Sequence, residues 1–276
     1  MKTAYLFPGQ GSQSASGLEL VRAEAPDLLT CCVDLIGEDP FARCDESTRF
    51  AQPAIVLTSL AAWRRTTPAE PRAYAGHSLG ELSALAAAGS ITQLDAVRLA
   101  VIRGEAMAKT GEASGAGSML AVLKGTPAEA LALAEEHGLS VANDNAPGEG
   151  VLSGSREAIA AARGSARERG LRVLELNVTG AFHSPAMAPA RQVFAQAAAE
   201  IEWQTPDFPV YSGLTAAPFV DPPLELGAAI ISPVRWREVM LALDAAGATE
   251  FVDLGPSDVL EKLVARNFPA VCDVVG

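Results

Sequence analysis

The sequence predicts an α/β protein with a parallel sheet and a smaller insert in the middle of the chain. Short apolar stretches typical of buried strands alternate with helical stretches, which is the pattern of a parallel sheet covered on both faces. The pattern changes after the Gly/Ser-rich segment at residues 111–118. Apolar residues make up 49% of the 276 residues, enough to fill one large domain or a large domain with an insert.

The first part of the chain supplies the strand and helix alternation. Residues 3–11, TAYLFPGQG, predict a buried strand that leads into a Gly-rich turn. Residues 51–65, AQPAIVLTSLAAWRR, predict a helix with Pro53 in its first turn. Residues 72–91 predict a short strand, a tight turn and an Ala/Leu helix that ends near Gly89.

Residues 92–109 then predict another helix, with Thr92 and Asp95 as a capping box. The next stretch predicts short β-α-β-α-β units of a split βαβ insert. A helical stretch follows from residue 180, and the α/β pattern returns to the end of the chain. The units of the insert are 119–125, 126–138, 139–154, 155–170 and 171–180. The segments of the returning α/β pattern are 210–219, 232–247 and 249–268.

Charge and composition exclude several classes of protein. The formal net charge of -12 disfavours nucleic acid as a partner. No apolar run reaches the roughly 18 residues of a membrane helix, and the N-terminus has no signal-peptide pattern, so we expect a cytoplasmic protein. The cysteines lack zinc-ligand spacing, so no metal is expected and all are interpreted as free thiols with buried or partly buried side chains. They are Cys31, Cys32, Cys44 and Cys272.

Ser78 is the candidate nucleophile. It lies between two glycines in GHSLG, at the predicted strand-to-helix turn, where a G-x-S-x-G sequence exposes the hydroxyl group. The amides at the start of the following helix favour a developing negative charge, and the Leu79 amide is one candidate oxyanion donor. An ordinary serine N-cap in a Gly-rich turn is the alternative interpretation.

A serine nucleophile needs a base, and the chain has three histidines. His77 is adjacent to Ser78 on a sharp turn, where neighbouring side chains diverge, and His137 lies at a predicted helix end. His183, in a loop after a strand, is the best candidate for the base; a structural histidine is the alternative. Gln10 follows the first strand and can donate to an oxyanion from its backbone or side chain, although a structural turn explains it equally.

Arg103 lies within the apolar helical run LAVIRGEAM and needs an anionic partner, because an unpaired buried guanidinium group is costly. A protein carboxylate and a substrate carboxylate held by the guanidinium fork are the two possibilities.

Eight segments, taken together, resemble the malonyl-CoA:acyl carrier protein transacylase family, the acyltransferases of fatty acid and polyketide synthesis. They occur in the family's order and span almost the whole chain. They are FPGQGSQ at 7–13, QPA at 52–54, GHSLGE at 76–81, IRGEAM at 102–107, NAPG at 145–148, GAFHSPAM at 180–187, SPVRW at 232–236 and LGP at 254–256.

The resemblance implies an α/β-hydrolase-like core, residues 1–117 and 180–276, with a ferredoxin-like insert over 118–179. It also implies a ping-pong reaction in which malonyl-CoA and an acyl carrier protein are the substrates, without a metal or redox cofactor. In the site, Ser78 would be acylated and His183 would be its base.

The other roles implied by the resemblance complete the pocket. Gln10 and the Leu79 amide would form the oxyanion hole, and Arg103 would hold the malonyl carboxylate in a pocket lined by Gln52. A backbone carbonyl group near SPVRW, at Ser232, would orient the histidine in place of an acid. Phe182 would limit bulk at the α-carbon of the acyl group, favouring malonyl over methylmalonyl by roughly 1–3 kcal/mol; a core residue is the alternative.

Departures from the family pattern concern the rim and the insert. Residues 14–50 and 222–230 are shortened, and Glu149 stands where an uncharged residue is more common. These differences bear on the identity of the partner more than on the acyl chemistry. The alternative functions are a hydrolase acting on acyl carrier proteins, a true esterase, a malonyl transferase subunit of a malonate decarboxylase, and a degenerate docking module. A basic patch for an acidic carrier is predicted from Arg191, Arg235, Lys262 and Arg266, with solvated surface charge as the alternative.

Overall fold

The larger of two sheets is parallel and confirms the predicted α/β class. In a computed structural model, residues 2–113, 115 and 117–269 are described. The sheet has the strand order β7-β2-β1-β8, and all three strand pairs are parallel. Its strands are β1 (Thr3–Phe7), β2 (Arg72–Gly76), β7 (Val210–Tyr211) and β8 (Glu250–Asp253).

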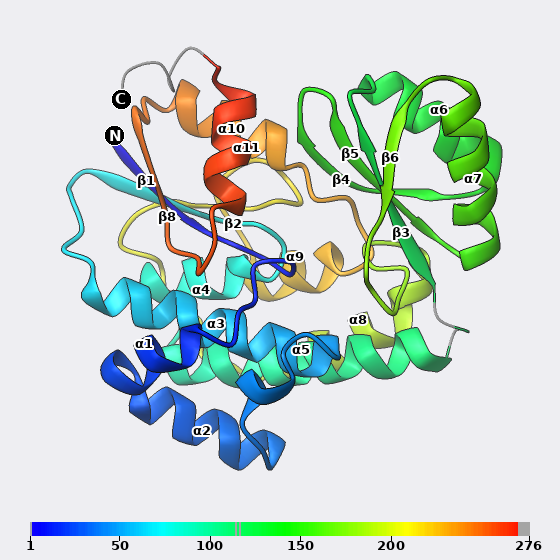
Figure 1. The fold of residues 1–276 in the computed structure, drawn as a ribbon. Coiled ribbons are helices and arrows are strands. Elements are labelled where there is room, and N and C mark those ends of the chain that lie inside the picture. The colour runs from blue at the N-terminus through cyan, green and yellow to red at the C-terminus, as the bar shows by residue number, and fades with distance from the viewer. Residues whose placement is uncertain (1, 114, 116, 270–276) are drawn as a thin grey trace.

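Helices cover both faces of this sheet (Figure 1). The helices on the two sides and at the N-terminus are α1 (Gly17–Glu24), α2 (Pro26–Ile36), α3 (Thr48–Arg65), α4 (Gly80–Ala87), α5 (Gln93–Ala113), α8 (Ala188–Ala199), α9 (Pro222–Ala229), α10 (Trp236–Ala245) and α11 (Val259–Asn267). Two 3₁₀ helices, η1 (Pro40–Arg43) and η2 (Pro185–Met187), precede α3 and α8. None of the helices in the described ranges is long and apolar enough to cross a membrane.

Side-chain alternation along the strands explains the two covering layers. Tyr5, Phe7 and Tyr74 belong to the larger core cluster with α3, α4 and α5, whereas Leu6 and Ala75 belong to a second cluster with α10 and α11. Successive residues of a strand point to opposite faces, so a parallel strand between two helical layers must be apolar throughout. Burial along the whole of β1 follows from this arrangement.

The second sheet is antiparallel and forms a separate lobe with its own apolar cluster (Figure 1). Its strand order is β4-β5-β3-β6, and Figure 1 shows two helices on one side of it. In chain order the elements are β3 (Ser118–Leu123), α6 (Pro127–His137), β4 (Ser140–Ala146), β5 (Glu149–Gly154), α7 (Arg156–Glu168) and β6 (Arg172–Glu175). The prediction of one β unit over 139–154 is therefore wrong, because these residues form a hairpin. Pro147 and Gly148 make its turn, and Gly148 adopts a φ of 78°.

Two further details of the prediction need correction or extension. The helix predicted from residue 51 begins at Thr48, because the Ser47 hydroxyl group accepts a hydrogen bond from the Arg49 amide and caps it there. Pro53 consequently lies inside α3 and not in its first turn. One half of the predicted capping box is present, because the Thr92 hydroxyl group accepts a hydrogen bond from the Asp95 amide at 3.0 Å. The Asp95 carboxylate accepts from the Thr92 hydroxyl group at 2.6 Å and not from the Thr92 backbone amide.

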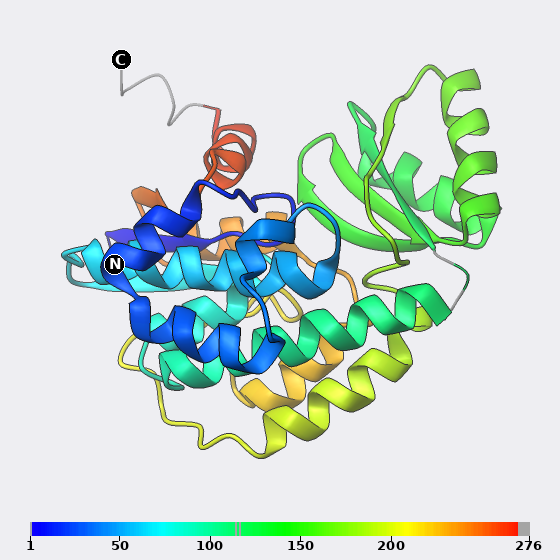
Figure 2. The same ribbon diagram turned by 60° about the horizontal axis from the view of Figure 1, so that its bottom comes forward.

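Strand β4 fastens the second sheet to the larger unit. Asn143 forms a parallel bridge with Val234, and the Asp144 carboxylate pairs with the Arg237 guanidinium group at 2.7 Å. Glu149 pairs with Arg266 of α11 across the same boundary. Figure 2 shows the two lobes side by side above the layer of α5 and α8. Several contacts of different kinds therefore fix the edge of the second sheet against the core.

Candidate active site

A cavity of about 570 Å³ opens at the carboxyl edge of the parallel sheet, where it meets the second sheet. This edge is where ligands bind in open α/β sheets. The larger unit contributes the loop after β1, the turn after β2, and side chains of α3, α5 and α11; the second sheet contributes β3, β4 and β5. The size is within the usual range for a small-molecule site.

Ser78 lies in the turn between β2 and α4, in the left-handed region with a φ of 53°. A non-glycine residue is uncommon in that region, and such strain is often found at functional sites. The flanking glycines permit the turn: a Cβ on Gly76 would overlap the Glu81 amide, and a Cβ on Gly80 would overlap the Phe7 carbonyl group. The GHSLG sequence is thus explained by close backbone packing that leaves the serine side chain facing the cavity.

His183 lies next to Ser78, although 105 residues separate them in the chain. Its Nε2 atom is 2.8 Å from Ser78 Oγ, and its Nδ1 atom lies 2.9 Å from the Ala229 carbonyl oxygen and 3.1 Å from that of Ser232. Ala229 is the last residue of α9, so the negative end of a helix dipole faces the imidazole ring. Sequence reasoning identified Ser232 but missed Ala229, because α9 was not predicted.

Burial lowers the pKa of His183 to about 4, and the positive charge of Arg103 contributes to the decrease. The imidazole is therefore neutral near pH 7 and can accept a proton from the serine. When it does so, the two carbonyl groups at Nδ1 stabilise the imidazolium ion that forms. This arrangement has the geometry that a general base oriented by backbone atoms, in place of a carboxylate, requires.

Arg103 reaches the same hydroxyl group from α5. It donates to Ser78 Oγ at 3.0 Å and to Gln52 Oε1 at 2.9 Å, and its side chain is buried. Burial lowers its pKa to about 10, with Glu81 acting in the opposite direction. Within the described residues, no carboxylate lies at ion-pair distance from Arg103. The guanidinium group thus lines the cavity without a direct anionic partner from the protein.

Gln52 of α3 and Gln10 of the loop after β1 both line the cavity. Gln52 also donates from Nε2 to the sulfur of Met107 at 3.3 Å, a weak acceptor. The Gln10 side chain donates from Nε2 to the Thr48 hydroxyl group at 2.9 Å. That bond uses one of the two N–H groups of the side-chain amide and fixes its position, and the backbone amide of Gln10 is a further donor for a ligand.

The backbone amides of Gln10 and Leu79 satisfy the first requirement of an oxyanion hole. Neither amide donates to a protein acceptor in the part of the chain that the structure describes. Both residues line the cavity. Unpaired amides of this kind, fixed by a strand-to-helix turn and a Gly-rich loop, can receive an oxygen that becomes negatively charged.

Phe182 lines the cavity beside His183 and is buried. A Cβ on Gly180 would lie 2.6 Å from Phe182 Cε1, so the glycine allows the ring to fold back against its own backbone. The neighbouring wall is apolar and is formed by Met107, Met119, Ala121, Val151, Leu176 and Val178.

The remaining histidines do not contact Ser78 Oγ. His77 Nε2 is 2.9 Å from Asn145 Oδ1, and its ring lies 5.3 Å from that of Trp236. His137 ends α6 and its Nε2 atom is 3.0 Å from the hydroxyl oxygen of Ser165. Because neighbouring side chains diverge on the sharp turn, the His77 ring points toward Asn145 and Trp236 and not toward Ser78 Oγ.

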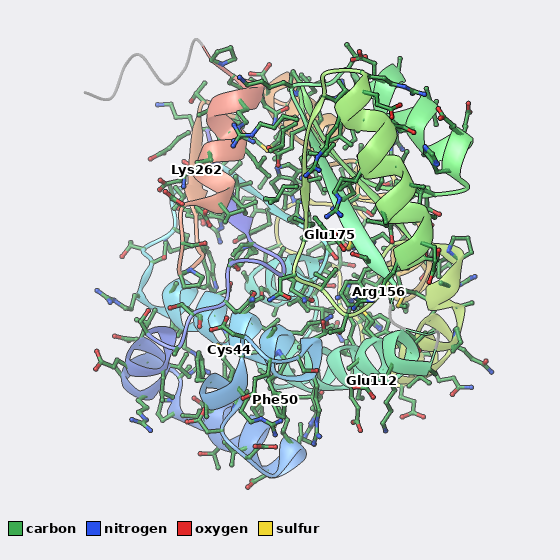
Figure 3. All side chains as sticks on the ribbon, turned by 45° about the vertical axis from the view of Figure 1, so that its right-hand side comes forward. Cys44, Phe50, Glu112, Arg156, Glu175 and Lys262 are labelled. Atoms are coloured by element: carbon green, nitrogen blue, oxygen red, sulfur yellow. The ribbon has the colours of Figure 1, made fainter. Side chains whose placement is uncertain are left out.

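The predicted basic patch is wrong as a single surface. Arg235 pairs with Glu238, Lys262 with Asp258 at 2.8 Å, and Arg266 with Glu149. Arg191 belongs to α8, which packs on α5 and α9, whereas Lys262, labelled in Figure 3, belongs to α11 on the opposite side of the molecule. Arg191 is therefore apart from Lys262, and each of the other three cations already has a carboxylate partner.

The cysteine side chains are described by the structure at three of the four positions. Cys32 and Cys44 are buried and Cys31 is partly buried; all three are free, and Cys272 lies outside the described residues. Burial raises the pKa of Cys32 to about 12. Among the residues that the structure describes, no group of three or more His, Cys, Asp or Glu side chains could hold a metal ion.

Known proteins resemble this chain along nearly its whole length. Residues 33–276 match the acyl transferase domain family. A malonyl CoA-acyl carrier protein transacylase from Bacillus subtilis (strain 168) is 37% identical, and the match covers 96% of this chain and 90% of that protein. The polyketide biosynthesis protein ThaF of Burkholderia thailandensis is 34% identical over 99% of this chain, which spans 25% of the length of ThaF.

Two solved structures have the same arrangement of elements. A malonyl CoA-acyl carrier protein transacylase from Coxiella burnetii superimposes with a TM-score of 0.89 at 28% identity, covering 98% of this chain and 92% of that one. A malonyl-transacylase in complex with a type II polyketide acyl-carrier protein superimposes with a TM-score of 0.87 at 29% identity, covering 98% and 94%.

Proposed function

Because this chain belongs to the acyl transferase domain family, we propose that it transfers a malonyl group from malonyl-CoA to the phosphopantetheine thiol of an acyl carrier protein. The observation that carries the proposal is the convergence on Ser78 Oγ, which lies 2.8 Å from His183 Nε2 and 3.0 Å from the Arg103 guanidinium group. A nucleophile, its base and a receptor for a carboxylate thus meet at one atom.

In the first half-reaction, Ser78 Oγ attacks the thioester carbonyl carbon while His183 Nε2 takes the hydroxyl proton. The carbonyl oxygen becomes an oxyanion and accepts hydrogen bonds from the Gln10 and Leu79 amides. The carbon–sulfur bond then breaks, and His183 returns its proton to the departing CoA sulfur. The products are malonyl-Ser78 and CoA thiol.

The second half-reaction reverses this order with a different thiol. His183 takes the proton of the phosphopantetheine thiol, whose sulfur attacks the ester carbonyl carbon. The carbon–oxygen bond breaks, Ser78 Oγ recovers the proton from His183, and the malonyl group leaves as a thioester of the carrier protein. Because CoA leaves before the carrier binds, the kinetics are ping-pong.

Arg103 selects the acyl group in this account. A malonyl ester on Ser78 carries a free carboxylate within reach of a guanidinium group that already contacts the serine oxygen. Gln52 Oε1 accepts a hydrogen bond from the same guanidinium group and holds it toward the cavity. A bidentate contact would pair the buried cation, whereas a neutral acyl group would leave it unpaired.

The proposal includes a description of the two units. We interpret residues 1–117 and 180–276 as an α/β-hydrolase-like core, and residues 118–179 as a ferredoxin-like insert. The β-α-β-β-α-β order of the second sheet supports the latter. A cytosolic location belongs to the same proposal, because the two proposed substrates, malonyl-CoA and an acyl carrier protein, are both water-soluble.

Intact-mass measurement separates transfer from hydrolysis. The protein is mixed with malonyl-CoA, freed of excess substrate, and then incubated with or without a carrier protein bearing phosphopantetheine. A malonyl adduct that persists in buffer and moves to the carrier supports the proposal. An adduct that is lost to water at the same rate with and without carrier would identify a hydrolase and contradict it. Transfer to the carrier subunit of a malonate decarboxylase in preference to an acyl carrier protein would identify the third alternative.

A further inference from the structure

One buried carboxyl group on the nucleophile helix has no part in the chemistry described above. Glu81 is the second residue of α4, three positions after Ser78, and its side chain is 2% exposed. It is not among the residues that line the cavity. Removing a carboxyl group from water is costly unless hydrogen bonds replace the lost hydration. Burial raises the pKa of Glu81 to about 8.

The hydrogen bond of Glu81 joins two distant parts of the larger unit. Its Oε1 atom accepts from the Gly213 amide at 2.7 Å, 132 residues along the chain. Gly213 is two residues beyond the end of β7, and a Cβ at that position would lie 3.4 Å from Glu81 Oε1. The carbonyl group of Gly213 in turn accepts from the Arg235 amide at 2.8 Å.

Gly213 and Arg235 are the two ends of the segment that orients the base. Between them lies α9, whose last residue, Ala229, presents its carbonyl oxygen to His183 Nδ1. Ser232, three residues before Arg235, presents the second carbonyl oxygen. The segment is therefore closed on itself by one backbone hydrogen bond and fastened to α4 by the Glu81 carboxyl group.

From this arrangement we infer that Glu81 is a positioning residue for His183, acting through the segment 213–235. Glu81 of α4 holds Gly213, and Gly213 holds Arg235 at the other end of the segment. The carbonyl groups of the segment contact His183 Nδ1. His183 Nε2 in turn contacts Ser78, which lies just before α4. The inference rests on the proposed function, because it assigns His183 the role of base. It explains a residue of the GHSLGE motif that contacts neither the cavity nor the nucleophile.

The charged groups that interact with Glu81 come from two other helices. Arg103 of α5 carries the opposite charge, and Glu225 of α9 carries the same charge. A hydrogen-bond acceptor, charged or neutral, satisfies the Gly213 amide. A glutamine at position 81 should therefore preserve the position of the segment, whereas an apolar side chain of similar length should not.

The test compares Glu81→Met, which keeps the volume but removes the acceptor, with Glu81→Gln, which keeps an acceptor. We measure single-turnover malonylation of Ser78, the KM for malonyl-CoA, and the imidazole NMR signals of His183. Misplacing a base by a fraction of an ångström to 1 Å costs up to about 100-fold in rate. We expect Glu81→Met to lower kcat about 10- to 100-fold with a nearly unchanged KM and displaced His183 signals. Glu81→Gln should restore kcat to within about threefold of the wild-type value.

Ser83→Ala is the matched control on the same helix. Ser83 is fully buried, and its hydroxyl group has no hydrogen-bond partner among the residues that the structure describes, so this variant measures the effect of disturbing the buried face of α4 alone. We expect wild-type kcat and unchanged His183 signals. A loss of kcat with Ser83→Ala equal to that with Glu81→Met would overturn the inference.

Gly213→Ala approaches the same hydrogen bond from its other end and serves if Glu81→Met does not fold. Its Cβ would lie 3.4 Å from Glu81 Oε1 and 3.3 Å from Val234 Cγ1, so a small displacement is expected. We expect kcat to fall about two- to tenfold with KM unchanged. Wild-type kcat in Glu81→Met or in Gly213→Ala, or equal losses in Glu81→Met and Glu81→Gln, would contradict the inference. If the wild-type protein itself forms no malonyl ester, the proposed function fails instead.

Discussion

Replacing Arg103 by alanine should remove the preference for a dicarboxylic acyl group. The guanidinium group is buried, contacts Ser78 Oγ at 3.0 Å, and has no carboxylate partner at ion-pair distance among the described residues. A malonyl carboxylate is therefore its expected anion. Acetyl-CoA offers the same thioester without that carboxylate and provides the reference substrate.

The magnitude follows from the burial of the pair. Removing one partner of a buried ion pair costs about 3–5 kcal/mol. The cavity is open to solvent at its mouth, which screens the interaction, so the lower end of that range applies. Because 1.4 kcal/mol corresponds to a tenfold change, 3 kcal/mol predicts that kcat/KM for malonyl-CoA falls about 100-fold. The contact between Arg103 and Ser78 affects both substrates alike, so the malonyl-to-acetyl ratio isolates the carboxylate contribution.

The assay measures acyl-enzyme formation from each thioester by rapid quench and mass spectrometry. Arg98→Ala is the control, because Arg98 lies on the same helix but is exposed and paired with Asp95. The ratio of kcat/KM for malonyl-CoA to that for acetyl-CoA should fall about 100-fold in Arg103→Ala and stay unchanged in Arg98→Ala. An unchanged ratio in Arg103→Ala would refute the assigned role of the guanidinium group.

Three further perturbations test the base His183, the acyl pocket at Phe182 and the loop after β1 that carries Gln10. Because burial lowers the pKa of His183 to about 4, its neutral form persists as the pH falls from 7; acylation should decline only as the pH passes through about 4, and a decline centred at 6.5, the ordinary value, would contradict this. Phe182→Ala should raise methylmalonyl relative to malonyl loading about tenfold in a competition assay, and an unaltered product ratio would argue against a role in selectivity. Thr48→Val removes the hydroxyl group that holds Gln10 and should lower kcat about tenfold, whereas Thr48→Ser should retain it; equal rates in both variants would show that the contact is dispensable.

Local sequence patterns predicted the parts of the site whose geometry is set by residues close together in the chain. The turn at Ser78 needs two glycines within five positions, and the reason is close backbone contact that a short motif can encode. Arg103 was recognisable as a single cation within an apolar helical run. His183 was selected by excluding the other two histidines, one on the wrong side of a sharp turn and one at a helix end.

Long-range contacts account for what the sequence did not predict. Ala229 has no polar side chain, and its part in holding His183 arises from where α9 ends in space. The sequence pattern does not separate β4 from β5, because only two residues, Pro147 and Gly148, form the turn between them. The four cations of the predicted basic patch do not form one surface because Arg191 lies on α8, away from α11, and because carboxylates pair with the other three, two of them from three or four residues away in the chain and Glu149 from β5.

The most direct test of the account locates the acyl group in the wild-type protein. The protein is mixed with malonyl-CoA without a carrier, quenched in acid, digested, and mapped by tandem mass spectrometry while released CoA thiol is counted. The account predicts a malonyl ester on Ser78, formed in an amount equal to the thiol released and absent from Ser78→Ala. An ester on another residue, or release of thiol without any ester on the protein, would contradict it.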